Sequence, residues 1–498
     1  MNKPIRTVSI FCLVLFLALM VNATYLQYYH ANALNDRSDN GRVAAATFSR
    51  ARGAILAGPK GGTVIAQSVE SQDQYKYQRV YKKPFMYAPI TGWYTFGNET
   101  GLERAQNSFL SGEDDSLFVN RLVDLVNGSA TKGGNILLTV DPAAQQAAYD
   151  GLRQLGPDVE GAVVAIEPST GKVLAMVSLP SYDPNKLADH DFKKANEYAA
   201  QLSKMKSQPL LNRAIQTTLP PGSTFKILTA GAGVQYDGLT ANSLVPAGPT
   251  YTLPQSNSVV HNEVPGCADK ITLTTALKYS CNTAFAPLAV KVGASDMHQA
   301  AEGFGFNQRY LDATQLGGQA ISRYPAGMDD AGTALSGFGQ GSVTASPLQM
   351  AMVTAGIANH GVVMKPYVWD TAQSPTSFET VRQTESTQLA QATSSTTASE
   401  VTKMMVATVA SGTAGPAAIP GIQVAGKTGT AQSGLTQANG EEVPPYAWFV
   451  GFAPANAPKV AVAVMIQHVD RPTDEIHGGT LGGPIARSVM EAVLNSGG

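Results

Sequence analysis

The segment LPPGSTFKIL, residues 219–228, places Ser223 three residues before Lys226, directly after a Pro-Pro-Gly corner. The corner and the apolar run after it predict a buried helix that begins at Ser223. A serine at a helix start is commonly only an N-cap. The same position also exposes the hydroxyl at the positive end of the helix dipole, with the lysine one turn further on the same face. Because burial lowers a lysine pKa toward that of a general base, the segment predicts either a cap or a nucleophile beside its base.

The pattern Ser-x-x-Lys occurs at two other places in the chain, and both have simpler explanations. Ser169 and Lys172 flank the turn of GAVVAIEPSTGKVLAMVSLP, which predicts a β-hairpin whose turn faces water. Ser203 and Lys206 lie in the polar stretch QLSKMKSQ, which is typical of a solvated helix surface. Only the copy after the Pro-Pro-Gly corner opens a buried helix.

Two further motifs follow this serine along the chain. YSCNTAF carries Ser280 and Asn282, and GKTGTAQ carries Lys427 on a strand-like run in which Lys-Thr-Gly occurs once. Another Ser-x-Asn, at residues 38–40, lies ahead of every Ser-x-x-Lys. One motif alone would be weak, but the order Ser-x-x-Lys, Ser-x-Asn, Lys-Thr-Gly is the signature of penicillin-recognising serine enzymes.

The chain resembles the monofunctional class B penicillin-binding proteins, and most narrowly the actinobacterial penicillin-binding protein A group of peptidoglycan transpeptidases. LTVDPAAQQAA, LNRAIQTTLPPGSTFKI, FGQGSVTASPLQMA, VAGKTGTAQ and GGPIAR are similar to the transpeptidase domain, and RGAILA and GWYTFGNETGLERAQNSFLSG to the N-terminal domain. The resemblance implies an α/β (α+β) fold: a penicillin-binding/serine β-lactamase-like transpeptidase domain with an antiparallel sheet flanked by helices, plus a smaller N-terminal non-catalytic domain. Strands at both ends of the transpeptidase region also predict one sheet whose outer strands come from distant sequence.

The chain is long enough for two or three globular domains, since it has 498 residues, of which 44% are hydrophobic and 14% charged. The resemblance implies a pedestal or dimerisation-like domain over residues 30–135. It implies the transpeptidase domain over residues 136–498.

The N-terminus predicts a membrane anchor. Residues 1–7 contain Lys3 and Arg6 and predict a short cytoplasmic tail, because positive charge favours the cytoplasmic side. Residues 8–29 are apolar with an aromatic outer edge and predict an uncleaved transmembrane signal-anchor. A cleaved signal peptide is the alternative. The first interpretation gives a single-pass protein of the cell membrane, and both place the catalytic domain outside the cytoplasm.

The resemblance assigns catalytic roles to five residues. Ser223 would attack the carbonyl of the penultimate D-alanine of a stem peptide, and Lys226 would take its proton. Ser280 would relay a proton to the departing D-alanine amine, and Asn282 would hold Lys226 or the substrate amide. Lys427 would lower neighbouring lysine pKa values by like-charge repulsion and attract the substrate carboxylate.

Three residues after this lysine are expected to bind substrate. Thr428 and Thr430 would hold the substrate carboxylate, and Gly429 suits the close approach of a strand to a ligand. The backbone N–H groups of Ser223 and Thr430 would form an oxyanion hole, worth roughly 3–4 kcal/mol per donor. The amine of a second stem peptide would then resolve the acyl-enzyme into a cross-link. β-Lactams would acylate the same serine and stay bound.

Cys267 and Cys281 both lie in the part expected outside the cytoplasm, the second of them inside the Ser-x-Asn motif. A disulfide between them would contribute about 3 kcal/mol in the chain-entropy model and would brace Ser280 and Asn282. Two buried free thiols are the alternative, and the sequence leaves both open.

Other activities remain as alternatives. A serine β-lactamase needs a base for its deacylating water, and Glu302 and Glu379, which follow the second motif, lack the Glu-x-x-x-Asn pattern of such a base. A DD-carboxypeptidase would use the same residues with water as acceptor. A β-lactam sensor would need a larger cytoplasmic or multi-span module than the short tail before the anchor.

Composition limits the partners. The formal net charge of −2 argues against nucleic-acid binding. Scattered histidines, and cysteines without Cys-x-x-Cys spacing, predict no metal, and no cofactor is expected. The expected partners are peptidoglycan stem peptides, β-lactam antibiotics, the cell membrane through the anchor and, by analogy, a membrane glycan polymerase.

Overall fold

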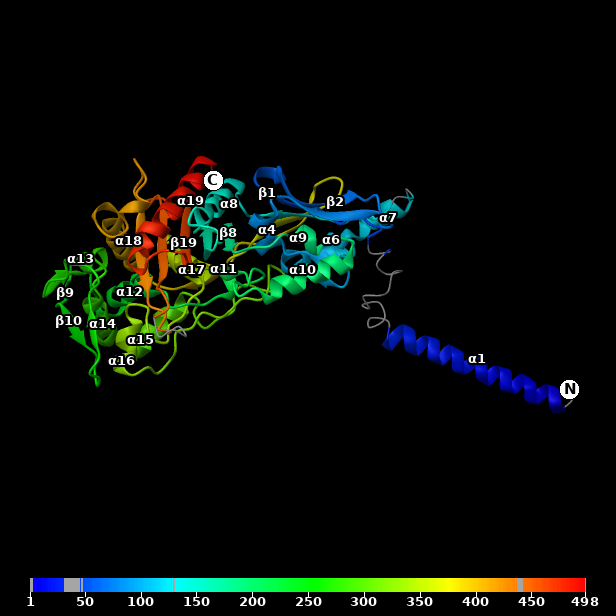
Figure 1. Ribbon diagram of the computed structural model, residues 1–498, viewed down its shortest axis with the longest axis horizontal. Coiled ribbons are helices and arrows are strands. Elements are labelled where there is room, and N and C mark those ends of the chain that lie inside the picture. The colour runs from blue at the N-terminus through cyan, green and yellow to red at the C-terminus, as the bar shows by residue number, and fades with distance from the viewer. Residues whose placement is uncertain are drawn as a thin grey trace.

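The computed structural model describes residues 3–30, 45, 48–126, 128, 130–434, 436 and 442–497. The other Ser-x-Asn, at residues 38–40, lies outside these ranges. Helix α1 (Lys3–Tyr29) stands apart from the body and buries none of its side chains (Figure 1). Its length and apolar composition suit a single membrane span, and it begins a few residues before the expected anchor.

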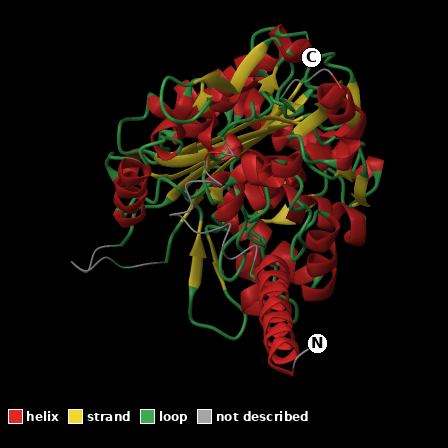
Figure 2. Ribbon diagram, turned by 90° about the vertical axis from the view of Figure 1, so that its right-hand side faces the viewer, coloured by secondary structure: helices red, strands yellow, loops and turns green. Residues whose placement is uncertain are grey.

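A five-stranded antiparallel sheet forms the centre of the larger part of the molecule, in the order β17-β18-β19-β7-β8. Its strands are β7 (Glu160–Ile166), β8 (Val173–Leu179), β17 (Ala425–Ala431), β18 (Tyr446–Ala453) and β19 (Val460–His468). Helices α8 (Pro142–Arg153) and α19 (Gly483–Asn495) pack on one face, and α17 (Pro347–Ala358) packs on the other. Figure 2 shows helices on both sides of the strands. The predicted antiparallel sheet flanked by helices, with strands from distant sequence, is confirmed.

Helix α17 is buried along its whole length and shows how tertiary contacts change a local prediction. Ser346 caps it, because its Oγ accepts a hydrogen bond from Gln349 N at 3.1 Å. Ser-x-x-Gln at a helix start is typical of a capping box, in which the Gln349 side chain would return to the Ser346 N–H, but no such bond forms here. The Gln349 Nε2 donates instead to Phe304 O at 2.7 Å, and Ser346 N donates to Ser322 Oγ at 3.0 Å. Burial gives both groups partners from distant sequence.

A second, six-stranded sheet has the order β15-β14-β6-β1-β2-β3. Its strands are β1 (Ile55–Ala57), β2 (Thr63–Glu70), β3 (Tyr77–Tyr81), β6 (Asn135–Leu138), β14 (Trp369–Gln373) and β15 (Thr380–Gln383). β6 pairs in parallel with β1 and antiparallel with β14. The expected domain boundary between residues 135 and 136 therefore falls inside a strand, and two strands from the later part of the chain complete the N-terminal sheet.

The remaining elements of the N-terminal end are short. They are η1 (Pro59–Gly61), α4 (Pro84–Thr91), β4 (Tyr94–Thr95), β5 (Asn98–Glu99), α5 (Gly101–Ala105), α6 (Asn107–Ser111), η2 (Asp115–Leu117) and α7 (Phe118–Val126), joined by α9 (Pro184–Leu187) and α10 (Phe192–Lys204) from further along the chain. Ser203 is exposed on α10, and Ser169 is exposed in the turn between β7 and β8. Both of these serines are thus solvated, as predicted, whereas Lys172 is half-buried and pairs with Asp370 at 3.5 Å.

Most of the other elements between β8 and β17 extend from the central sheet toward the opposite end of the body (Figure 1). Its helices are α11 (Arg213–Gln216), η3 (Gly222–Phe225), α12 (Lys226–Asp237), α13 (Leu273–Lys278), α14 (Asn282–Val292), α15 (Ala294–Gly303), α16 (Asp330–Ser336), α18 (Ser395–Ser411) and η4 (Gly415–Ala417). Its short strands are β9 (Leu244–Pro246), β10 (Thr250–Thr252), β11 (Val259–His261), β12 (Lys270–Thr272), β13 (Val362–Met364) and β16 (Gln388–Gln391). The turn η3, which carries the serine, lies against the edge strand β17.

Candidate active site

Ser223 lies in the 3₁₀ turn η3, which leads directly into α12. The serine is 7% exposed, and its side chain caps neither the turn nor the helix. The interpretation of this serine as an N-cap is therefore wrong. Gly222 gives the turn its shape, because it has a φ of +54° and donates its N–H to Gly339 O at 3.0 Å.

The Lys226 side chain is fully buried and connects the first motif to the second. Its Nζ donates to Ser280 O at 2.7 Å and to Asn282 Oδ1 at 2.7 Å, and it lies 3.1 Å from Ser280 Oγ. The expected contact between Asn282 and this lysine is present. Ser223 lies three residues earlier, in η3, but its hydroxyl is not among the hydrogen-bond partners of Lys226.

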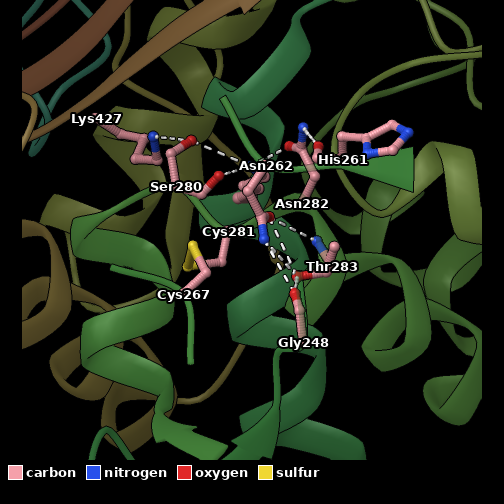
Figure 3. The surroundings of a disulfide bond; sticks show 10 residues. Gly248, His261, Asn262, Cys267, Ser280, Cys281, Asn282, Thr283 and Lys427 are labelled. Carbon is pink, nitrogen blue, oxygen red and sulfur yellow. Dashed lines mark hydrogen bonds between the residues drawn. A yellow bond between two sulfur atoms is a disulfide. The ribbon is translucent and has the colours of Figure 1, made fainter. Parts of the chain in front are cut away.

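The Ser280 hydroxyl lies between two buried lysines. Lys427 Nζ donates to Ser280 Oγ at 2.9 Å (Figure 3). The same Nζ donates to the carbonyl of Thr428 at 2.8 Å. With the Lys226 contact, a single hydroxyl joins the amines of the first and third motifs. Residues from three distant segments of the chain therefore meet at one point, as the order of the motifs predicted.

The edge strand β17 presents its two faces to different neighbours, since side chains alternate along a strand. A Cβ at Gly429 would lie 3.0 Å from Thr224 Cγ2 and 3.1 Å from Pro221 O, so this position packs directly on the serine's turn. Thr428 points to the other face, where its hydroxyl lies 2.8 Å from Thr413 Oγ1. Thr430 follows on that face and is partly exposed.

Both lysines have lowered pKa values. Burial lowers the pKa of Lys226 well below its ordinary value, and the charge of Lys427 lowers it further. Burial also lowers the pKa of Lys427, to about 7. The carboxylate of Glu263 acts in the opposite direction on both lysine pKa values. Both shifts favour the neutral amine, so a neutral lysine is available as a base.

A loop ending in the disulfide fixes the second motif. Cys267 and Cys281 are bonded, with their Cα atoms 5.8 Å apart, so the bridged alternative holds in the structure. Asn282 Nδ2 donates to His261 O at 3.0 Å, and the neighbouring Asn262 Nδ2 donates to Thr283 Oγ1 at 2.9 Å (Figure 3). These bonds hold the residues before the disulfide against the start of α14.

Sequence reasoning missed four neighbours of the site: His261, Asn262, Glu263 and Thr413. No local pattern marks them. His261 accepts the Asn282 hydrogen bond through its backbone carbonyl, and the other three are common polar residues in loops. In the ranges that the structure describes, no three His, Cys, Asp or Glu side chains are grouped as metal ligands.

Known proteins share both parts of this architecture. Residues 161–491 match the penicillin-binding protein transpeptidase domain, and residues 52–136 match the penicillin-binding protein A dimerisation domain. The chain is 40% identical over 504 residues to the peptidoglycan D,D-transpeptidase PbpA of Mycolicibacterium smegmatis, with 100% of both chains covered. It is 39% identical to PbpA of Mycobacterium tuberculosis, with 99% of both covered.

Solved structures agree with the sequence comparison. The ceftriaxone acyl-enzyme complex of M. tuberculosis penicillin-binding protein A matches with a TM-score of 0.83 and 39% identity, covering 90% of this chain and 100% of that chain. The penicillin G acyl-enzyme complex of the same protein matches with a TM-score of 0.82 and 38% identity over 90% and 100% of the two chains. The chain belongs to the penicillin-binding proteins with a transpeptidase domain, in the penicillin-binding protein A group.

Proposed function

We propose that this chain is a peptidoglycan D,D-transpeptidase in which Ser223 forms an acyl-enzyme with a stem peptide ending in D-alanyl-D-alanine. The observation that carries the proposal is the convergence of Lys226, Ser280 and Lys427 through a single hydroxyl, beside the turn that holds the serine. Relatives that are 39–40% identical over their full length are named D,D-transpeptidases. Solved structures of one of them are β-lactam acyl-enzymes, so β-lactams are the expected inhibitors.

The contacts of Lys226 suit a general base. A neutral lysine has two N–H bonds, and the two shortest contacts, to Ser280 O and Asn282 Oδ1, use both. The lone pair remains for a proton from Ser223 as its Oγ bonds to the carbonyl carbon of the penultimate D-alanine. The developing oxyanion is stabilised by the N–H groups of Ser223 and Thr430.

Breakdown of the tetrahedral intermediate needs a proton on the departing amine. Ser280 supplies this proton by donating its hydroxyl hydrogen. Its oxygen is reprotonated by Lys226 or Lys427, the two amines beside it. Lys427, Thr428 and Thr430 bind the terminal carboxylate of the substrate, and Gly429 keeps β17 close to the serine. The amine of a second stem peptide then attacks the ester, which forms the cross-link and frees Ser223.

The alternatives differ in the acceptor. Water as acceptor would make the enzyme a DD-carboxypeptidase. For a β-lactamase, Glu302 would have to reach the ester, but its side chain is exposed and its partners are His298 on α15 and Asn307 in the loop after that helix. Glu379 lies in the turn between β14 and β15, in the other sheet. Neither glutamate bonds to a motif residue, which favours slow deacylation by water.

We also propose that the catalytic domain is extracytoplasmic and that residues 136–498 are the transpeptidase domain, with residues 30–135 as a non-catalytic domain that contacts a membrane glycan polymerase. The positive charges at Lys3 and Arg6 and the Cys267–Cys281 disulfide support the orientation. Reaction of a membrane-impermeant thiol reagent with an engineered exposed cysteine in intact cells tests the orientation. Co-purification of the full chain with the polymerase tests the partner.

Labelling with a fluorescent penicillin tests the nucleophile. Wild type, Ser169→Ala and Ser203→Ala should be labelled, and Ser223→Ala should not, because the two control serines have the same spacing to lysine but lie in solvent. Labelling of Ser223→Ala would place the nucleophile elsewhere. With peptidoglycan strands as substrate, D-alanine release with cross-linked product supports transpeptidation, and D-alanine release without it identifies a carboxypeptidase.

A further inference from the structure

Helix α7 faces the opposite way from an ordinary surface helix of a globular protein. Its apolar side chains are 50–79% exposed, namely Phe118, Val119, Leu122, Val123, Leu125 and Val126. Its polar side chains, Asn120, Arg121 and Asp124, are the partly buried ones. At 3.6 residues per turn the two sets occupy opposite sides of the helix, and an apolar stripe ordinarily faces the core.

Hydrogen bonds hold α7 in this orientation. Asn120 Nδ2 donates to Ser374 Oγ at 3.1 Å, in the turn between β14 and β15. Arg121 Nη1 donates to Asp114 O at 2.6 Å and to Gly112 O at 3.1 Å. The polar face is therefore bound to the body, and the apolar face is presented outward.

The position of α7 indicates what lies opposite that face. The segments on either side of the helix bond to the residues at which the chain arrives from α1: Gly53 N donates to Leu110 O, and Gly133 N donates to Ala51 O, both at 2.9 Å. α7 also lies at the end of the body opposite α13 and β9 (Figure 1). The chain between Tyr29, where α1 ends, and Phe48 can span at most roughly 65 Å. The helix is thus at the end of the body tethered to the membrane.

We propose that α7 lies in the membrane surface, with its apolar side chains inserted between the lipid headgroups, as a second contact beside α1. Short amphipathic helices bind lipid in this way, about 5–10 Å deep. The tether keeps the body close to the bilayer, so a small apolar contact is sufficient. Two contacts, rather than a single flexible one, would restrict the angle of the body to the membrane.

A second copy of the chain is the main rival occupant, since the family domain that includes α7 is described as a dimerisation domain. The exposed face of α7 is roughly 14 Å long and 10 Å wide. A stable protein interface needs roughly 800 Å² per partner, so this helix alone is too small for one.

The charges near α7 indicate which lipids it requires. Glu113 and Asp115 are exposed directly before the helix, and Arg121 is turned toward the body. The helix presents no cationic face, so anionic lipid should not be needed. Phosphatidylcholine vesicles are therefore the appropriate probe.

A fluorophore on α7 tests the proposal in the full-length protein. Val126→Cys would carry a nitrobenzoxadiazole label in a Cys12→Ser background, with the protein inserted in phosphatidylcholine vesicles through α1. The matched control is Leu244→Cys on β9, another exposed apolar position (66%, against 79% for Val126) at the opposite end of the body. Labelling by fluorescent penicillin shows that each variant is folded.

The Val126 label should emit at shorter wavelength than the Leu244 label and lose roughly half its intensity with spin-labelled lipid, because it lies within the quencher's depth. The additional change Leu122→Asp should abolish both effects. Equal emission and equal quenching at the two positions would overturn the proposal. A blue shift that disappears when each vesicle holds one copy would also overturn it, in favour of a dimer.

Discussion

Ser280 combines an unfavourable backbone with a central side chain. Its φ of +59° is costly for a residue with a Cβ, roughly 1–2 kcal/mol. The conformation persists because Lys226 holds its carbonyl and the next residue, Cys281, is bonded to Cys267. The strained turn places the hydroxyl between the two lysine amines, the position that the proposed proton relay requires.

Two substitutions at this position separate the hydroxyl from the backbone. Ser280→Ala and Ser280→Gly should both acylate β-lactams about 10²–10⁴-fold more slowly, because both lack the relay. Since only glycine adopts positive φ freely, Ser280→Gly should unfold at a temperature no lower than that of Ser280→Ala. Stopped-flow acylation and thermal unfolding measure the two effects. Wild-type acylation by either variant would remove Ser280 from the mechanism.

The exposed carboxylate of Glu263 should set the pH at which the site becomes active. It raises the pKa of both Lys226 and Lys427, so Glu263→Gln should lower both. A lower pKa populates neutral Lys226 at lower pH, and the acid limb of the acylation rate should shift to lower pH. Lys427, with a pKa of about 7, would also lose its charge sooner, which weakens binding of the substrate carboxylate as pH rises.

The control for this shift is Glu302→Gln. The partners of the Glu302 carboxylate lie on α15 and in the loop after it. Its pH profile of acylation should coincide with that of the wild type. Superimposable pH profiles for Glu263→Gln and wild type would show that the Glu263 carboxylate does not influence the pKa of Lys226. The sequence offered no means to select Glu263, because its effect depends on a loop that folds back onto the start of α14.

At the scale of elements, the approach of β17 to the serine's turn depends on a missing side chain. Gly429 faces Thr224 and Pro221 at distances that a Cβ would reduce to 3.0–3.1 Å. Such contacts are tighter than ordinary van der Waals packing, so the strand or the turn would have to move by a few tenths of an ångström.

Gly429→Ala should therefore slow acylation far more than it lowers stability. Small displacements of a reacting group cost up to about 10²-fold in rate. The matched control is Gly231→Ala on α12, where a Cβ would meet its nearest atoms at 3.7–3.8 Å. That variant should acylate normally and gain about 0.4–1 kcal/mol of stability. Acylation kinetics and thermal unfolding of both variants test this prediction. Equal acylation rates for Gly429→Ala and wild type would show that β17 can accommodate a Cβ at this position.

Elements with a strong local signal were predictable, and those defined by distant pairing were not. Asp141 capping α8, the hairpin of β7 and β8, and the buried face of α19 follow from turn residues and periodicity. The pairing of β14 and β15 with the N-terminal sheet could not be predicted, because the sequence of a short strand does not specify which strand it pairs with. Of the site, the three motifs were predictable, and the loop that supports them was not.

At the scale of the molecule, the two parts of the chain share structure rather than a linker. β6 and β14 pair in one sheet, and the Asn135 side chain accepts a hydrogen bond from Ala54 N at 2.8 Å. In the same region Glu103 is fully buried between Arg52 and Arg79, at 2.6 and 2.7 Å. We therefore expect the body to unfold as one cooperative unit.

Glu103→Gln tests this cooperativity, because it leaves two buried guanidinium groups without their carboxylate, at a cost of about 3–5 kcal/mol. Arg79 also donates to Gly53 O at 2.7 Å, directly before β1, so the loss is transmitted to the strand that pairs with β6. Circular dichroism and the capacity for penicillin labelling should then fall together, several degrees below wild type, whereas the exposed Glu113→Gln should change neither. Two separate transitions, with labelling preserved through the first, would instead show that the catalytic sheet and its serine are stable without the N-terminal sheet.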